Sequence, residues 1–477
     1  PVGRPASRAP LGNGPAEPWE EADPPPAPWG TRPRPDAVEA ALPRASTVVL
    51  TNGARLYVDH AHPEYSSPEV LTPHDAVVWD RAGELVARRA MIALAEGAGG
   101  VVPGEVVLYK NNVDGKGATY GSHENYLVRR DLAFSDLAPV LIPFLVTRPV
   151  IAGAGRVGIG QRSQRPGFQV SQRADYVESD VGLQTTFNRP IVNTRDEPHA
   201  DAGRFRRLHI INGDANRFDV PIYLKVATTD LLLWFLEQAH HDGTGALRDA
   251  LTDLNRLAIT GDPVEAHWAV SHDPTLAYEL PTRNGPMSAL AVQRTYLDAI
   301  APAVRRSADP EAQRALSLWQ QSLGALEQWS RDGSGPAAHL VEWVAKYELC
   351  EGLRRRSGTG WDDPRLAALD IQWADLRPGS SVVDKLDAAG RIHRLVTESE
   401  VQRAADAPPE GTRAAIRGTA INRYPQIVGA SWTCLVLDVP GHPELLRLRL
   451  PDDVAVGADE TVTILEEIGR RAAPERD

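Results

Sequence analysis

Residues 52–65 read Asn52-Gly53-Ala54-Arg55-Leu56-Tyr57-Val58-Asp59-His60-Ala61-His62-Pro63-Glu64-Tyr65. After a glycine turn, polar and apolar residues alternate from Arg55 to Asp59, which is typical of a strand. Because alternate side chains of a strand point to opposite faces, we expect Leu56 and Val58 to pack inward. The polar residues Arg55, Tyr57 and Asp59 then line the other face, which is a candidate floor of an active site.

Oxygen-bearing side chains continue beyond this strand. Glu64 supplies a second carboxylate, and Ser66 and Ser67 supply hydroxyls. Such oxygens suit Mg²⁺, which also keeps waters and phosphates in its coordination shell. From spacing alone, an exposed strand edge with a proline turn explains the same pattern.

Two later segments are also rich in polar residues. Lys110 to Tyr126 holds several glycines after an apolar run, and there His123 is a candidate metal ligand and Asn125 a candidate nucleotide contact. Beyond Asn193 to Asp201, Arg207 and His209 share one face of a predicted strand, which favours phosphate and metal contacts. A structural histidine and a solvated basic face remain the alternatives.

The remaining pattern predicts an α+β fold, with strands concentrated before about residue 230 and helices after it. Further strands are expected at 48–50, 106–109, 190–193, 208–211, 433–439 and 445–450. Helices are expected at 75–96, 228–240, 288–306, 311–331 and 337–356. Phosphate loops of the Walker type, the Rossmann glycine fingerprint and the nucleophile elbow are absent from the sequence.

Bulk composition restricts function only broadly. The 477 residues carry a formal charge of −12, which argues against nucleic-acid binding over the whole surface. No apolar run is long enough to span a membrane. Only Cys350 and Cys434 occur, without metal-type spacing, so a cytoplasmic location is expected.

The three polar motifs, taken together and in this order, resemble the family of Pup ligases and Pup deamidases/depupylases. They are Asn52 to Tyr65, Tyr109 to Leu127, and Asn193 to Asp201. The direct run from Asp59 to His62-Pro63-Glu64, and Ser122 before His123, resemble the deamidase/depupylase branch rather than the ligase. The resemblance implies a glutamine-synthetase-like catalytic domain, with a curved, mainly antiparallel sheet packed by helices, and a small C-terminal domain.

The resemblance also implies roles for individual residues. Asp59 corresponds to the catalytic aspartate, and Arg173 and Arg195 lie in matching segments that face Pup or phosphate. The implied magnesium ligands are Tyr57, Glu64, His123 and His209. The implied ATP contacts are Ser66, Ser67, Asn125, Arg207 and Trp432.

The implied activity is an ATP- and Mg²⁺-dependent hydrolase of the Pup–proteasome pathway. It deamidates the C-terminal Gln of Pup and cleaves the isopeptide bond between Pup and a lysine of a pupylated protein. No nucleic-acid or membrane partner is implied, and the proteasome is involved only indirectly. The alternatives are a Pup–protein ligase and a catalytically impaired Pup-binding homologue.

The expected organisation has three parts: a Pro-rich mobile loop or linker at 1–45, the catalytic domain at 46–400, and the small domain at 401–477. The family begins with a short strand that holds two nearby glutamates, and nothing before Asn52 matches it. We therefore expect this strand to lie upstream of Pro1, and the chain without it to have an incomplete metal site.

Overall fold

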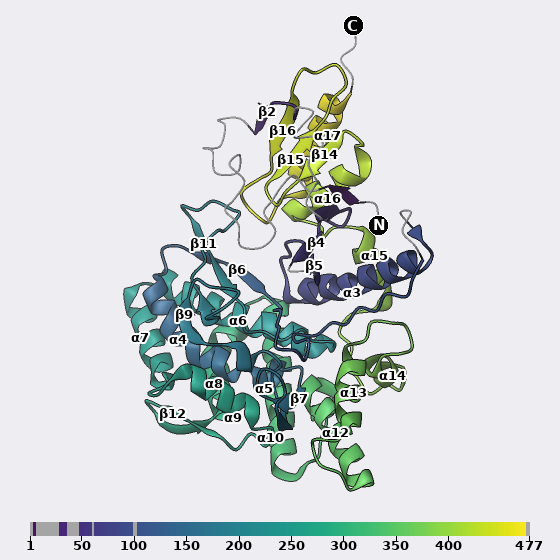
Figure 1. Ribbon diagram of the computed structural model, residues 1–477. Helices are drawn as coiled ribbons and strands as arrows, with labels where there is room; N and C mark the ends of the chain where they lie inside the picture. Colours follow the sequence, from purple (N-terminus) through teal and green to yellow (C-terminus); the bar gives the residue numbers. More distant parts are fainter. Residues whose placement is uncertain (1–2, 6–27, 36–46, 60–61, 99–102, 474–477) are drawn as a thin grey trace. The chain divides into compact units, whose positions relative to one another are not determined.

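A computed structural model describes residues 3–5, 28–35, 47–59, 62–98 and 103–473. These residues form two compact units (Figure 1). Unit 1 takes its described residues from 1–86, 199–202 and 396–477, and unit 2 from 87–198 and 203–395. Residues from the two ends of the chain therefore belong to the same unit.

The first sheet of unit 1 contains the strand that the sequence singled out. Its order is β1-β3-β4-β5, and all neighbouring strands are antiparallel. The strands are β1 (Gly3–Pro5), β3 (Thr47–Leu50), β4 (Arg55–Asp59) and β5 (His62–Ser66). The turn between β3 and β4 places Gly53 at φ 78°, a conformation that glycine adopts without steric cost.

The inward packing predicted for Val58 is wrong, because 39% of its surface is exposed. Val58 is the most exposed residue of β4, while the polar residues beside it are partly buried. The strand alternation is therefore present, but it does not separate a core face from a solvent face.

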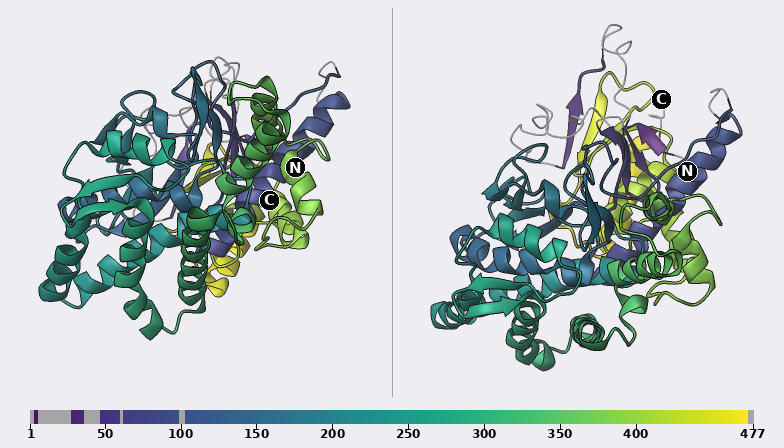
Figure 2. Two further views of the ribbon diagram at one scale, coloured as in Figure 1. Left: turned by 90° about the horizontal axis from the view of Figure 1, so that it is seen from below. Right: turned by 60° about the horizontal axis from the view of Figure 1, so that its bottom comes forward.

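The second sheet of unit 1 joins the two ends of the chain. Its order is β14-β15-β16-β2, formed by β14 (Ile427–Ala430), β15 (Cys434–Leu437), β16 (Leu445–Arg449) and β2 (Trp29–Arg32). Figure 2 shows the purple β2 beside the yellow strands, in agreement with the pairing of Leu446 with Thr31. Within the predicted 1–45 loop, Trp29–Arg32 is therefore a strand, while residues 6–27 and 36–46 lie outside the described part.

Helices complete unit 1. They are α15 (Glu398–Asp406), α16 (Arg413–Arg423), α17 (Ala458–Ala472) and the first part of α3 (Pro73–Ala95). A buried core joins β3, α16, the second sheet and α17, and includes Val49, Ile416, Leu435 and Ile468. The predicted boundaries at residues 45 and 400 remain a prediction, and this core shows that material from both sides of them packs together.

Unit 2 is built around a mixed sheet of order β6-β11-β10-β9. These strands are β6 (Glu124–Arg129), β11 (Phe205–Ile210), β10 (Pro190–Asn193) and β9 (Ser179–Gly182), and only β9 and β10 are parallel. The helices α4 (Phe134–Thr147) and α6 (Asp219–His241) pack against it (Figure 1). Apolar residues buried on these helices, such as Leu141, Phe144 and Leu232, form the core beneath the sheet.

Shorter elements surround this core. Two hairpins are formed by β7 (Arg156–Ile159) with β8 (Arg165–Gln169), and by β12 (Glu279–Thr282) with β13 (Gly285–Ser288). The other helices of unit 2 are α5 (Pro149–Ala152), η2 (Ala174–Tyr176), α7 (Thr244–Leu254), η3 (Asn255–Leu257), α8 (Pro263–His272), α9 (Ala289–Arg306), α10 (Pro310–Asp332), α11 (Ala337–Leu340), α12 (Glu342–Ser357), α13 (Pro364–Ala374) and α14 (Val382–Ala388).

Local sequence explains where several of these helices begin. Asp262, Asp309 and Asp363 each precede a proline, and each side chain accepts a hydrogen bond from the backbone N–H two residues later. Aspartate at the N-cap and proline at the first helical position are both favourable, so the Asp-Pro pairs fix the starts of α8, α10 and α13. No helix among the described residues is long and apolar enough to cross a membrane.

The predicted helices at 75–96, 288–306 and 311–331 are confirmed by α3, α9 and α10. The strand predicted at 106–109 is wrong: only Tyr109 makes an isolated bridge, to Asp375. The single helix predicted at 337–356 is also wrong, because Val341 is extended and separates α11 from α12. The Glu342 carboxylate is buried at this break, where it accepts hydrogen bonds from the Arg217 and Phe218 amides.

Candidate active site

In unit 1, the candidate residues lie on the antiparallel pair β4 and β5. Tyr57 is directly opposite Glu64, and Asp59 is opposite His62. The Tyr57 hydroxyl donates a hydrogen bond to Glu64 Oε1, and Ser66 Oγ lies 3.4 Å from the Tyr57 oxygen. The pairing of β4 with β5 therefore brings together two predicted metal ligands, Tyr57 and Glu64, and the predicted ATP contact Ser66, while Ser67 follows immediately beyond β5.

This group of oxygens is poorly solvated. Burial raises the pKa of the Tyr57 phenol, and the charge of Glu64 raises it further. Burial also raises the pKa of Glu64, where the hydrogen bond from Tyr57 acts in the opposite direction. A cation would stabilise the charged form of this carboxylate, because an opposite charge offsets the cost of burial.

In unit 2, the candidate residues lie on the antiparallel pair β6 and β11. Asn125 is directly opposite His209, and Arg207 is two residues away on the same face. His209 Nδ1 donates to Asn125 Oδ1 over 2.7 Å. This tautomer, assigned from the hydrogen bond, leaves the Nε2 lone pair of His209 available to a metal.

His123 precedes β6 and packs edge-on against His209, with 5.1 Å between the ring centroids. A Cβ at Gly121 would lie 2.4 Å from the His123 ring, so only glycine leaves room for this histidine. Burial, then Arg173 and Arg207, lower the pKa of His123 to about 3. Burial, then His123 and Arg207, lower the pKa of His209 to about 2. Both imidazoles are therefore neutral near pH 7, which is the form that ligates metals.

Arginines surround these histidines. Arg207 and Arg195 both pair with the half-exposed Glu197, at 3.6 and 3.1 Å. Arg173 is buried and donates to Thr119 Oγ1 over 2.6 Å, and burial together with Arg189 lowers its pKa to about 9. Such crowding of cations favours an anionic ligand.

Arg189 was not singled out by the sequence. It lowers the pKa of both Arg173 and His123 through its charge, and it donates to the Thr185 carbonyl. It lies just before β10, and no motif marks it. Only its position beside the other cations reveals it.

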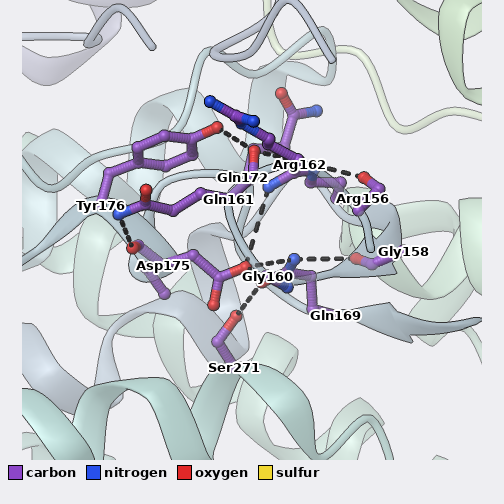
Figure 3. A network of polar contacts seen from close by, with 12 residues as sticks. Arg156, Gly158, Gly160, Gln161, Arg162, Gln169, Gln172, Asp175, Tyr176 and Ser271 are labelled. Atoms are coloured by element: carbon purple, nitrogen blue, oxygen red, sulfur yellow. Dashed lines mark hydrogen bonds and ion pairs between the residues drawn. The ribbon is translucent and has the colours of Figure 1, made fainter. Parts of the chain in front are cut away.

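A polar network next to Arg173 holds the β7–β8 hairpin (Figure 3). The Asp175 carboxylate accepts hydrogen bonds from the Gly160 amide and from Gln169 Nε2, at 2.8 and 2.9 Å. The Tyr176 hydroxyl donates to the Gln161 carbonyl, and Arg156 donates to the same carbonyl. The turn of this hairpin is therefore fixed from within unit 2.

Trp432 lies in unit 1, between β14 and β15, with its ring partly exposed. The Arg417 guanidinium is 4.9 Å from the ring centroid, a cation–π arrangement. The sequence indicated Trp432 only through resemblance, and it gave no sign of Arg417.

The donor set fits magnesium in part. Tyr57 and Glu64 supply oxygens, and His123 and His209 supply neutral nitrogens. Within the described residues, no three His, Cys, Asp or Glu side chains are grouped as a metal site. Each unit thus contributes a pair of predicted ligands, and the assignment of all four stays a prediction.

The sequence was compared with protein families and with known proteins. The family described as Pup-ligase protein matches residues 15–436, and the chain belongs to this family. The Pup deamidase/depupylase of Mycolicibacterium smegmatis is 46% identical over 419 residues, covering 87% of this chain and 80% of the relative. The Pup–protein ligase of Kribbella flavida is 41% identical over 389 residues, covering 80% and 81%.

A solved structure of the Pup ligase PafA in complex with ADP resembles the fold closely. Its TM-score is 0.77 at 32% identity, covering 91% of this chain and 92% of the ligase. The predicted α+β, glutamine-synthetase-like fold is confirmed by this likeness.

Proposed function

We propose that this protein is a Pup deamidase/depupylase: a hydrolase that converts the C-terminal Gln of Pup to Glu and cleaves the isopeptide bond between Pup and a target lysine. The carrying observation is the 46% identity to a Pup deamidase/depupylase, higher than the 41% identity to a ligase. The short Asp59–Glu64 connection and Ser122, both resembling the hydrolase branch, agree with it.

Asp59 is the residue that acts on the scissile amide. Its carboxylate either attacks the side-chain carbonyl, forming an anhydride as the amine leaves with a proton, or accepts a proton from the attacking water and passes it to that amine. In the first route, water then hydrolyses the anhydride and regenerates Asp59. Both routes end with a free carboxylate on Pup and a free amine or ammonia.

Other residues bind and orient. Arg173 and Arg195, in a region crowded with cations, hold the anionic end of Pup or a phosphate. Tyr57, Glu64, His123 and His209 would hold Mg²⁺, and Ser66, Ser67, Asn125, Arg207 and Trp432 would hold ATP. When bound, the metal ion and the nucleotide supply positive charge and phosphate oxygens that neutralise and shape the site. The ADP-bound ligase of the same fold supports nucleotide binding here.

The test is incubation of the full chain with a purified Pup–protein conjugate, ATP and Mg²⁺. We expect release of the free target, with ATP consumption far below one molecule per bond cleaved. A parallel reaction contains free Pup ending in Glu, the unmodified target and the same nucleotide.

Formation of conjugate with matching ADP in the parallel reaction would instead establish a ligase, the activity of the structurally similar PafA. Tight Pup binding without either reaction would establish an impaired Pup-binding homologue.

A further inference from the structure

Arg417 on α16 is fully buried and contacts two distant backbone carbonyls. Its Nε and Nη2 donate to the Gly53 carbonyl over 3.1 and 2.7 Å. Its Nη1 donates to the Trp432 carbonyl over 3.0 Å, and the guanidinium lies against the Trp432 ring. One side chain therefore fixes both the backbone and the ring of Trp432 relative to the turn that begins β4.

Glu69 holds the Arg417 guanidinium in place. Both Glu69 carboxylate oxygens bond to Arg417, at Nη1 and Nη2. Burial would raise the pKa of Glu69, but Arg417 and Arg413 outweigh it and hold this pKa at about 2. Glu69 is therefore charged at neutral pH, and it lies only two residues beyond Ser67.

The backbone around Arg417 leaves little room for movement. A Cβ at Gly418 would lie 2.3 Å from the Thr51 carbonyl oxygen and 2.9 Å from the Gly53 amide nitrogen. The helix α16 thus packs directly on the β3–β4 turn, which fixes the starting point of the Arg417 side chain.

We propose that Arg417, anchored by Glu69, is a positioning residue for nucleotide binding that sets the Trp432 ring relative to β4 and the serines after it. The inference rests on the proposed function, because it takes Trp432 as a nucleotide contact. It adds a residue that acts through Trp432 and does not itself touch the nucleotide.

Arg413 offers a matched control. It lies one helical turn before Arg417, is equally buried, and pairs with Glu69 over 2.8 Å. Its other contacts are the carbonyls of His199 and Pro451, at 2.7 and 3.2 Å. A loss of stability is common to both arginines, whereas an effect through Trp432 is expected only from Arg417.

The experiment measures the Kd of the full chain for ATP by calorimetry, together with the thermal unfolding midpoint. Arg417→Lys keeps the charge but loses the fork and the stacking, so we expect the Kd to rise about tenfold. Arg413→Lys should lower the thermal unfolding midpoint about as much as Arg417→Lys does, because both arginines are buried. It should change the Kd for ATP by less than about twofold. Equal effects of both variants on the Kd would overturn the inference.

A double variant tests whether Arg417 acts through Trp432. In a Trp432→Leu background, we expect Arg417→Lys to change the Kd by less than about twofold, because the ring that it positions is gone. Full additivity would contradict the inference. Unchanged ATP binding by Trp432→Leu alone would overturn it too.

One further outcome separates this inference from the proposed function. Cleavage of Pup conjugates that proceeds normally, with no binding of ATP by the wild-type chain, would overturn the inference and leave the hydrolase intact. If Arg417→Lys does not fold, Glu69→Gln replaces it, with an expected rise in Kd of about threefold. An unchanged Kd in a folded Glu69→Gln variant would then count against the inference.

Discussion

The two units present candidate ligands of opposite character. On β4 and β5, oxygens of Tyr57, Asp59 and Glu64 gather, and burial makes the Glu64 charge costly. On β6 and β11, neutral histidines lie among arginines whose charges lower the pKa of His123, and Arg189 also lowers that of Arg173. The first arrangement favours a cation and the second an anion. The ligands proposed above, ATP and Mg²⁺, carry charges of both signs.

The largest expected effect comes from replacing the Asp59 carboxylate on β4. Asp59→Asn removes the carboxylate that we propose attacks the scissile carbonyl or takes a proton from water, while preserving the size of the side chain. We therefore predict that cleavage of a Pup conjugate slows by about a thousandfold or more. Single-turnover cleavage measures this, with ATP binding as the control for an intact site. Cleavage at the wild-type rate would exclude Asp59 from the reaction.

A smaller effect is expected from replacing His209 on β11. His209→Ala removes a neutral ligand, so the Mg²⁺ concentration for half-maximal activity should rise roughly 10- to 100-fold. Titration of Mg²⁺ at saturating ATP gives this number. Asp180→Asn, on the exposed part of β9, is the control and should leave the titration unchanged. An unchanged titration for His209→Ala would remove this residue from the ligand set.

Lowering the pH tests how the charge of Glu69, which holds Arg417 against the turn before β4, stabilises unit 1. The folded pKa of Glu69 is about 2, below its ordinary value of 4.5, so its contribution to stability is complete above pH 4.5 and is lost as the pH falls toward 2. This contribution is on the order of 3 kcal/mol.

Urea unfolding of wild type and Glu69→Gln at several pH values measures the effect. The difference in unfolding free energy between the two should shrink steadily as the pH falls from 4.5 toward 3. A constant difference would show that the charge of Glu69 does not stabilise unit 1.

The smallest effect sharpens the description of β4. Val58 is exposed, so Val58→Thr should change the unfolding free energy by less than about 0.5 kcal/mol. The buried Val49 of the neighbouring strand is the contrast, and Val49→Ala should cost about 2 kcal/mol or more. Urea unfolding of both variants checks this. A large effect of Val58→Thr on the unfolding free energy would support inward packing of Val58 after all.

Local sequence patterns predicted much of the fold. Features that depend on contacts between distant segments were not predicted. The periodicity of α9 and α10 and the alternation in β11 are visible in the sequence, because each depends on neighbouring residues. The strand at Trp29–Arg32 was missed, since its pairing with β16 joins residues about four hundred positions apart. The helix break at the extended Val341 was missed, because it coincides with hydrogen bonds from a distant segment to the buried Glu342 carboxylate.

The candidate site shows the same division. The alternation placed Arg207 and His209 on one face, and the register with β6 agrees. Arg413 and Arg417 carried no signal, because they bond to carbonyls far along the chain. Arg189 carried none because its effect is on the pKa values of His123 and Arg173, which lie in other segments. The individual roles of the predicted ligands stay predictions.

The long reach of Arg417 bears on synthesis of the protein. Its hydrogen bond to Gly53 joins residues 364 positions apart, and β4 cannot gain this support until α16 has been translated. Unit 2 consists of residues 87–198 and 203–395, so all of it has been translated before α16 emerges from the ribosome. The strand that carries Asp59 therefore gains its support from α16 only after unit 2 has been translated.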